Sequence, residues 1–142
     1  MVNKLLNAVT KQLGTTFGDK YRYYVENVEQ NLTTPCFTID TLLSMERSKS
    51  PVLYDRVHPL VIHYFSDNKI NTKQDCYSVN ERLLECLEYL PFGNTLLRGE
   101  DITYQMVDDV LQVFVTYKFT TQKVVDAIDS IEVYEGVTTR VQ

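Results

Sequence analysis

Residues 110–120 alternate between apolar and polar side chains with few exceptions. One set of alternate positions holds Leu111, Val113, Val115, Tyr117 and Phe119, and the other holds Gln112, Thr116 and Lys118. Successive side chains of a β-strand point to opposite faces of the sheet, so the pattern predicts a strand with one buried face. Residues 102–107 precede it across Asp108-Asp109, and the two segments predict a hairpin.

A second pair of extended segments lies earlier in the chain. Residues 35–45 also alternate, and the side chains expected on their buried face include Phe37, Ile39, Leu43 and Met45. We expect residues 52–65 to run back alongside this strand, with the charged residues 46–51 as a long, mobile loop. Pro59 has no N–H to donate to a ladder, so it marks an edge or a bulge in the returning strand.

Two segments have the period of an amphipathic helix. Residues 2–17 place Val2, Leu5, Leu6, Val9, Leu13 and Phe17 on one face, and residues 72–90 place Cys76, Val79, Leu83, Leu87 and Leu90 on one face. Shorter strands are expected at 21–28 and 131–134. This order predicts an α+β fold: a mainly antiparallel sheet with two amphipathic helices packed on one face and a long extended hairpin. We expect one domain over residues 1–142, with about 135–142 as a flexible tail.

Charge and hydropathy exclude some classes of protein. The chain has 14 Lys and Arg against 19 Asp and Glu, a net charge of −5. A protein that binds DNA without sequence preference needs a basic surface, so this class is disfavoured. Residues 1–6 lack the apolar core of a signal peptide, and the aliphatic run at 60–62 is too short to span a bilayer. We therefore expect no membrane partner.

The histidines and cysteines are the first candidates for metal binding or catalysis. His58 and His63 are five residues apart in an extended segment, so a regular strand places them on opposite faces; a bulge at Pro59 would be needed to unite them. A nucleophilic cysteine would need a histidine and a third, orienting group beside it. We predict no catalytic, cofactor-binding or metal-binding residue. The cysteines are instead expected to be reduced, buried thiols: Cys36, Cys76 and Cys86.

The aromatic content points toward protein contacts. The chain has 10 Tyr and no Trp, and tyrosine combines apolar area with a polar tip, as is typical of interfaces. A charged loop tip adds little to a core but reaches toward neighbours. We therefore predict an interface made by these residues: Tyr21, Tyr23, Tyr24, Glu46, Arg47, Ser48, Lys49 and Ser50.

Several short segments follow the N-terminal helix in a set order. They are Val28-Glu29-Gln30, Pro35-Cys36-Phe37-Thr38-Ile39, Tyr54-Asp55-Arg56 followed by Pro59, Ile62-His63-Tyr64-Phe65, Leu87-Glu88-Tyr89-Leu90, Leu97-Arg98-Gly99, and Val110-Leu111 with Phe114-Val115 and Tyr117. In order and spacing the chain resembles the tail terminator family of phages and prophages of Gram-positive bacteria. Members often carry glycine in the turn before the last long strand, where this chain has Asp108-Asp109.

The resemblance implies a structural protein and not an enzyme. Tail terminators are α+β proteins that form a hexameric ring on the head-proximal end of the tail tube, stop its polymerisation and offer a docking surface to the neck. The implied partners are other copies of the chain, the tail tube protein, a neck or head-completion protein and the sheath protein of a contractile tail. DNA passes through such a ring only as cargo. The implied location is the tail–neck junction of a virion assembled in the host bacterial cytoplasm, or a headless, tail-like bacteriocin.

Two alternatives stay open beside this resemblance. One is a different neck or connector protein of the same particle. The other, from another class, is a small monomeric α+β domain that binds a ligand or catalyses a reaction. The negative net charge is compatible with a ring through which DNA passes, because an acidic lining repels the phosphates of DNA and prevents sticking.

Overall fold

The computed structural model describes residues 2–26, 32–125 and 131–133. The elements within these ranges are α1 (Val2–Phe17), β1 (Arg22–Val25), β2 (Cys36–Thr41), β3 (Met45–Ser48), β4 (Leu53–Phe65), α2 (Thr72–Glu88), β5 (Tyr89–Phe92), β6 (Thr95–Val107), β7 (Val110–Val125) and β8 (Ile131–Val133). The strands form one sheet in the order β1-β2-β4-β7-β6-β5, with β3 paired to β4 and β8 paired to β7. Every pair is antiparallel among these strands except β1 with β2.

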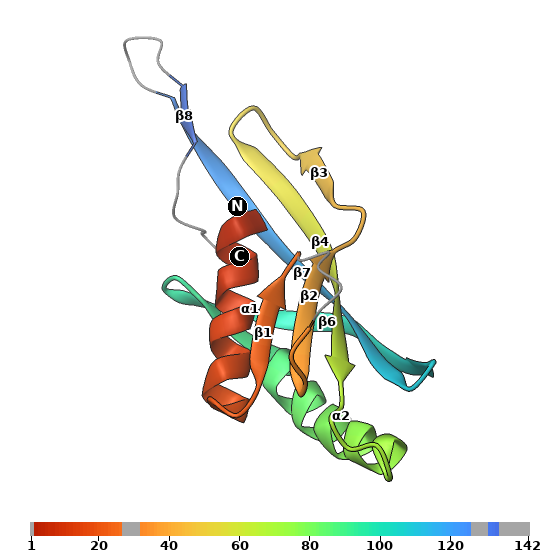
Figure 1. Ribbon diagram of the computed structural model, residues 1–142. Helices are drawn as coiled ribbons and strands as arrows, with labels where there is room; N and C mark the ends of the chain where they lie inside the picture. The colour runs from red at the N-terminus through yellow and green to blue at the C-terminus, as the bar shows by residue number, and fades with distance from the viewer. Residues whose placement is uncertain (1, 27–31, 126–130, 134–142) are drawn as a thin grey trace.

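Both helices pack on the same face of the sheet, which we call the inner face (Figure 1). The apolar stripe of α1 is buried there, and so are the alternate positions predicted for β7. The predicted α+β architecture is therefore confirmed. α1 ends where Gly18 adopts a φ of +86° and its N–H donates to the carbonyl of Gly14 at 2.9 Å, a conformation that glycine tolerates best.

The C-terminal end of α2 is buried and capped by side chains from other elements. A helix leaves its last carbonyls without helical partners, so a buried end needs outside donors. Gln12 on α1 donates from Nε2 to the carbonyl of Cys86 at 3.0 Å, and Tyr117 on β7 donates from Oη to the carbonyl of Leu87 at 2.8 Å. Gly99 packs so closely under this end that a Cβ there would clash with the same Leu87 carbonyl. These contacts fix α2 against α1 and the sheet.

β4 and β7 form a long ribbon through the centre of the sheet. They pair from Leu53 with Gln122 to Tyr64 with Leu111. β2 lies beside one half of β4 and β3 beside the other half, so the ribbon continues past the part that the helices cover (Figure 1). We call this continuation, residues 42–57 with 118–122, the arm.

The strand predicted at 35–45 is broken in the middle. Thr41 pairs with Leu60, and Met45 pairs with Val57. The three residues 42–44 therefore lie opposite only two residues, His58 and Pro59. One extra residue makes a bulge, and a one-residue shift reverses which side chains face the core. Pro59 lies at this break, where the interrupted pairing does not require the N–H that proline lacks. Its carbonyl accepts a hydrogen bond from the N–H of Leu42 at 2.9 Å.

The prediction that Leu43 and Met45 are buried is therefore wrong. Their exposed fractions are 87% and 50%. Two strands also begin earlier in the chain than we expected. β5 starts directly after α2, in a segment where we expected no strand, and β6 starts at Thr95, whereas we expected a strand from residue 102. Neither helix of the described residues is long and apolar enough to cross a membrane. The tail predicted at about 135–142 lies outside the described residues.

Candidate assembly surface

The region predicted as a mobile loop is a tight hairpin. Residues 45–48 form β3, so only 49–52 connect it to β4. The N–H of Lys49 donates to the carbonyl of Leu53 at 2.8 Å, Ser48 Oγ donates to the carbonyl of Ser50 at 2.9 Å, and Ser50 Oγ accepts from the N–H of Leu53 at 3.1 Å. Serine closes such turns through its hydroxyl, and this explains why the polar sequence folds here. The end of the arm is thus a defined surface.

Polar side chains join the three strands of the arm on both faces. On the inner face, Arg56 Nη2 lies 2.9 Å from Glu46 Oε1, and Arg56 Nε donates to Thr121 Oγ1 at 2.8 Å. On the opposite, outer face, Asp55 Oδ1 lies 3.7 Å from Lys49 Nζ and accepts from Thr120 Oγ1 at 2.9 Å. Arg56 of β4 thus links β3 to β7, and Asp55 of β4 links Lys49, in the turn after β3, to β7. The arm is therefore held by charge-assisted bonds instead of by a covering helix.

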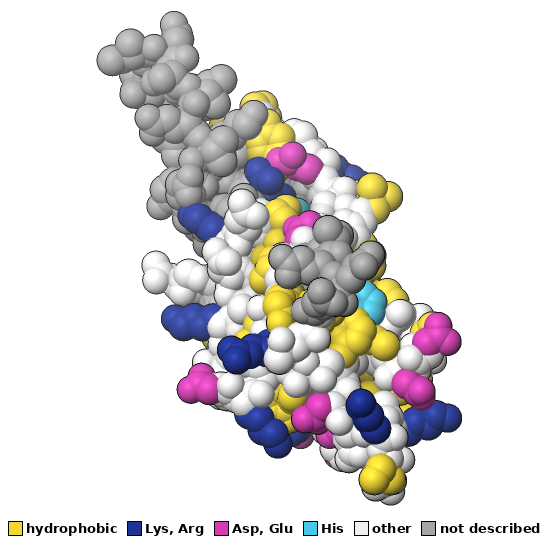
Figure 2. All heavy atoms as spheres, in the orientation of Figure 1, with side chains coloured by type: hydrophobic (Ala, Val, Ile, Leu, Met, Phe, Trp, Pro, Cys, Tyr) yellow, Lys and Arg dark blue, Asp and Glu magenta, His cyan; other side chains and the backbone are white. Residues whose placement is uncertain are grey.

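An apolar patch lies beside these charges. It consists of Leu42, Leu43 and Met45, at and after the break between β2 and β3, and Figure 2 shows hydrophobic side chains at the surface there. We call it the apolar step. Exposed apolar groups that adjoin one another are typical of protein contact sites. Sequence reasoning missed the step because it placed Leu43 and Met45 in the core. The available signal was Leu42, an apolar residue at a position where the alternation requires a polar one.

His58 closes the base of the arm. It is 4% exposed, its Nδ1 lies 2.9 Å from Ser44 Oγ, and its ring lies 5.5 Å from that of Phe119. Its Nε2 has no hydrogen-bond partner among the described residues. Burial, together with the nearby charge of Arg56, lowers the pKa of His58 below its usual range, so the neutral ring is favoured.

The residues considered for metal binding and catalysis do not form a reactive centre in the described structure. His58 lies on the inner face, whereas His63 lies on the outer face, 3.8 Å from Asp40 Oδ2. Cys36 is on the neighbouring strand, but no hydrogen bond among the described residues joins it to His63, and burial raises the pKa of its thiol. A thiol kept protonated is a poor nucleophile. No group of three potential ligands among the described residues is placed to bind a metal ion.

The three cysteines are buried and unpaired, as predicted. Burial raises the pKa of each thiol, and that of Cys86 reaches about 11.

The predicted tyrosine cluster lies apart from the arm, on β1 and just before it. Tyr21 packs its ring 5.4 Å from that of Phe37, and Tyr23 stacks on the same ring at 5.7 Å. Tyr23 also donates to the carbonyl of Gly18 at 2.8 Å, and Tyr24 Oη accepts from the N–H of Thr33 at 3.2 Å. The structure does not bring the two predicted groups together: β1 borders β2, and β3 borders the other half of β4.

Comparison with known protein families places most of the chain in a family. The family model described as phage tail terminator protein matches residues 4–129, a range that runs from α1 to the end of β7 and includes the arm. No curated protein matches the chain.

Proposed function

Because the chain belongs to the phage tail terminator family, whose members are structural and non-enzymatic tail proteins, we propose that it caps the head-proximal end of the tail tube as a hexameric ring. In this position it stops polymerisation of the tube and provides the docking surface for the neck. Its partners are then other copies of itself, the tail tube protein and a neck or head-completion protein. In a contractile tail the sheath protein is a further partner. DNA crosses the ring only as cargo.

The apolar step on the arm carries the proposal. A monomer gains nothing from an 87% exposed Leu43, whereas a contact with a tube subunit would bury it. The charge pairs around Arg56 and Asp55 hold the step in a fixed position before any partner arrives, which lowers the entropic cost of binding. We therefore assign the arm, including Glu46, Arg47, Ser48, Lys49 and Ser50, to the contact with the tube.

The test is the length of the tails that a particle carrying the variant Leu43→Ser with Met45→Ser assembles. Both side chains are at least half exposed, so the variant should melt within a few degrees of the unchanged protein. Tails of uncontrolled length, or tails without heads, are expected in electron micrographs.

Ile70→Ser is the matched control, because Ile70 is 91% exposed and lies outside the arm. It should leave tail length unchanged. Normal tails with the Leu43→Ser, Met45→Ser variant would remove the arm from the tube contact. Normal tails in particles that lack the protein altogether would refute the terminator function itself.

A further inference from the structure

A groove lies on the side of α1 that faces away from the core. Its volume is about 800 Å³, and its walls are the outer surface of α1 and the turn from β5 to β6. Lys4 and Lys11 line it, and their seven-residue spacing sets them two helical turns apart on one face, about 10 Å along the axis. Ala8, Pro91 and Phe92 contribute apolar surface to the groove. The groove is therefore lined by two lysines over an apolar base.

The walls of this groove are held in place by the core. Gln12 binds the carbonyl of Cys86, which ties α1 to the end of α2, and the ring of Phe92 lies 5.3 Å from that of Phe119. The intervening turn uses Gly93 with a φ of +60°. A site formed in advance binds without the cost of ordering its walls.

The two-residue turn between β6 and β7 has complementary chemistry. Val107 pairs with Val110, and Asp108 and Asp109 have φ values of +51° and +63°. Asn-Gly forms such a turn most easily, because both positions have a positive φ. With two aspartates, the turn carries two carboxylates at positions where glycine would be less strained. Neither carboxylate forms a salt bridge with a described residue, and Val107 beside them is 41% exposed. The hairpin thus presents an acidic tip with an apolar shoulder.

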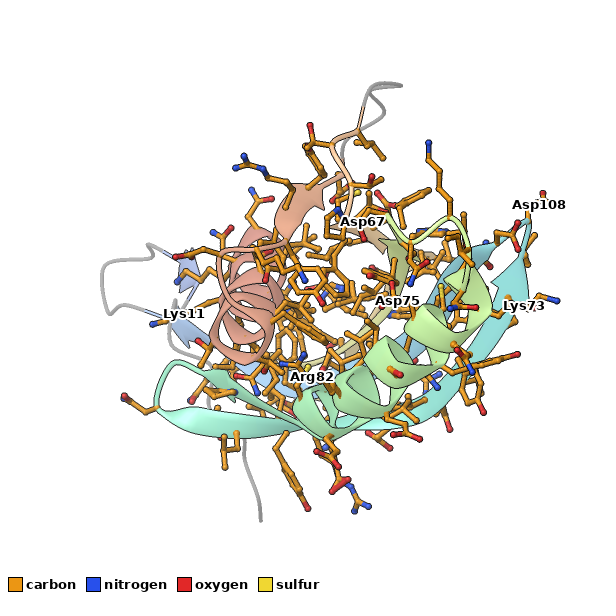
Figure 3. All side chains as sticks on the ribbon, turned by 60° about the horizontal axis from the view of Figure 1, so that its bottom comes forward. Lys11, Asp67, Lys73, Asp75, Arg82 and Asp108 are labelled. Carbon is orange, nitrogen blue, oxygen red and sulfur yellow. The ribbon has the colours of Figure 1, made fainter. Side chains whose placement is uncertain are left out.

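The groove and the acidic tip lie on opposite sides of the molecule. Figure 3 shows Lys11 at one side and Asp108 at the far side, beyond α2. Figure 2 shows the same separation as Lys and Arg side chains over α1 and acidic side chains at the β6–β7 hairpin. One copy cannot bring its own tip to its own groove, but two copies can meet head to tail. Contacts between two different patches generate a ring when the rotation closes.

We propose that the groove receives the β6–β7 tip of a second copy, with Asp108 and Asp109 facing Lys4 and Lys11. The inference rests on the proposed ring and names the two surfaces that join its subunits. Removal of the acidic charges should weaken association at least about tenfold, and association should also weaken as the salt concentration rises.

The first test replaces the tip in the full-length chain by Asp108→Asn with Asp109→Gly. Asn-Gly is the preferred sequence for this turn, so the monomer should melt at the same temperature or higher. Sedimentation, with tube protein added if the ring needs it, should show that the ring is lost. Asp67→Asn with Glu81→Gln removes two exposed charges elsewhere and should assemble normally.

The second test uses Lys4→Glu with Lys11→Glu, which reverses the charge of the groove and keeps good helix-forming residues. This variant should not assemble alone. Mixed with the tip variant, it should form a dimer and stop there, because its intact tip fits the intact groove of the other but no third copy can join. Lys69→Glu, an exposed lysine outside the groove, is the control.

Rings that form normally with the tip variant would overturn the inference and leave the ring itself intact. A mixture of the two variants that closes full rings would also overturn it. If the unchanged protein forms no ring even with tube protein, the proposed function and the inference fail together.

Discussion

The two halves of the β4–β7 ribbon are built from the same strands but are stabilised differently. In the half beneath the helices, Leu60, Ile62 and Val115 are almost fully buried. In the arm, the same two strands carry Arg56, Asp55 and Thr121, and their partners are polar groups on neighbouring strands. Burial of apolar area stabilises the first half. In the second half Phe119 is the buried apolar residue, and hydrogen bonds and ion pairs join the strands beyond it.

The difference shows why one half is suited to stability and the other to contact. Burial of a large apolar side chain contributes about 1.5–3 kcal/mol, whereas an exposed ion pair contributes about 0–1 kcal/mol. The arm can therefore change at little cost to the fold, and its surface is open to a partner. Three substitutions test this contrast, beginning with the largest expected effect.

The substitution Leu87→Ala should have the largest effect. Leu87 is fully buried between α2 and the sheet, so the variant leaves a cavity and should lose about 2–5 kcal/mol of unfolding free energy. Urea denaturation measures the loss. The neighbouring exposed residue provides the control, Glu88→Ala, which should change stability by less than about 0.5 kcal/mol. A similarly small loss for Leu87→Ala would contradict the packing of α2.

The substitution Tyr117→Phe should have an intermediate effect. It removes only the hydroxyl that caps the carbonyl of Leu87, and a buried acceptor without a partner costs about 1–3 kcal/mol. Thermal or urea unfolding detects it. Tyr104→Phe, at a residue that is 51% exposed, makes the same chemical change and should be neutral. Equal stability of the two variants would mean that the cap does not contribute.

The substitution Glu46→Gln should have the smallest effect. Glu46 is half exposed, and loss of its bond to Arg56 should cost about 1 kcal/mol or less at low salt. The same comparison in 1 M salt should shrink the difference, because the Debye length is then about 3 Å. A loss as large as that for Leu87→Ala would show that the arm is part of the stabilising core.

Periodicity alone predicted most of the secondary structure. The helix at 2–17 agrees with α1, and the helix at 72–90 ends two residues late, because Tyr89 already belongs to β5. The alternation at 111–119 predicted the buried face of β7 correctly. These patterns are local, and each strand or helix repeats its own period regardless of its neighbours.

The sequence by itself determined the fold class, the buried cysteines and the opposite faces of His58 and His63, because these follow from the spacing of residues along one element. Only the tertiary structure decided the register of β3, the exposure of Leu43 and Met45, and the positions of the groove and the acidic tip. The break opposite Pro59 adds one residue to one strand but none to its partner. Pairing between strands sets that register, and a one-residue shift exchanges buried and exposed side chains. No pattern within a single segment contains this information.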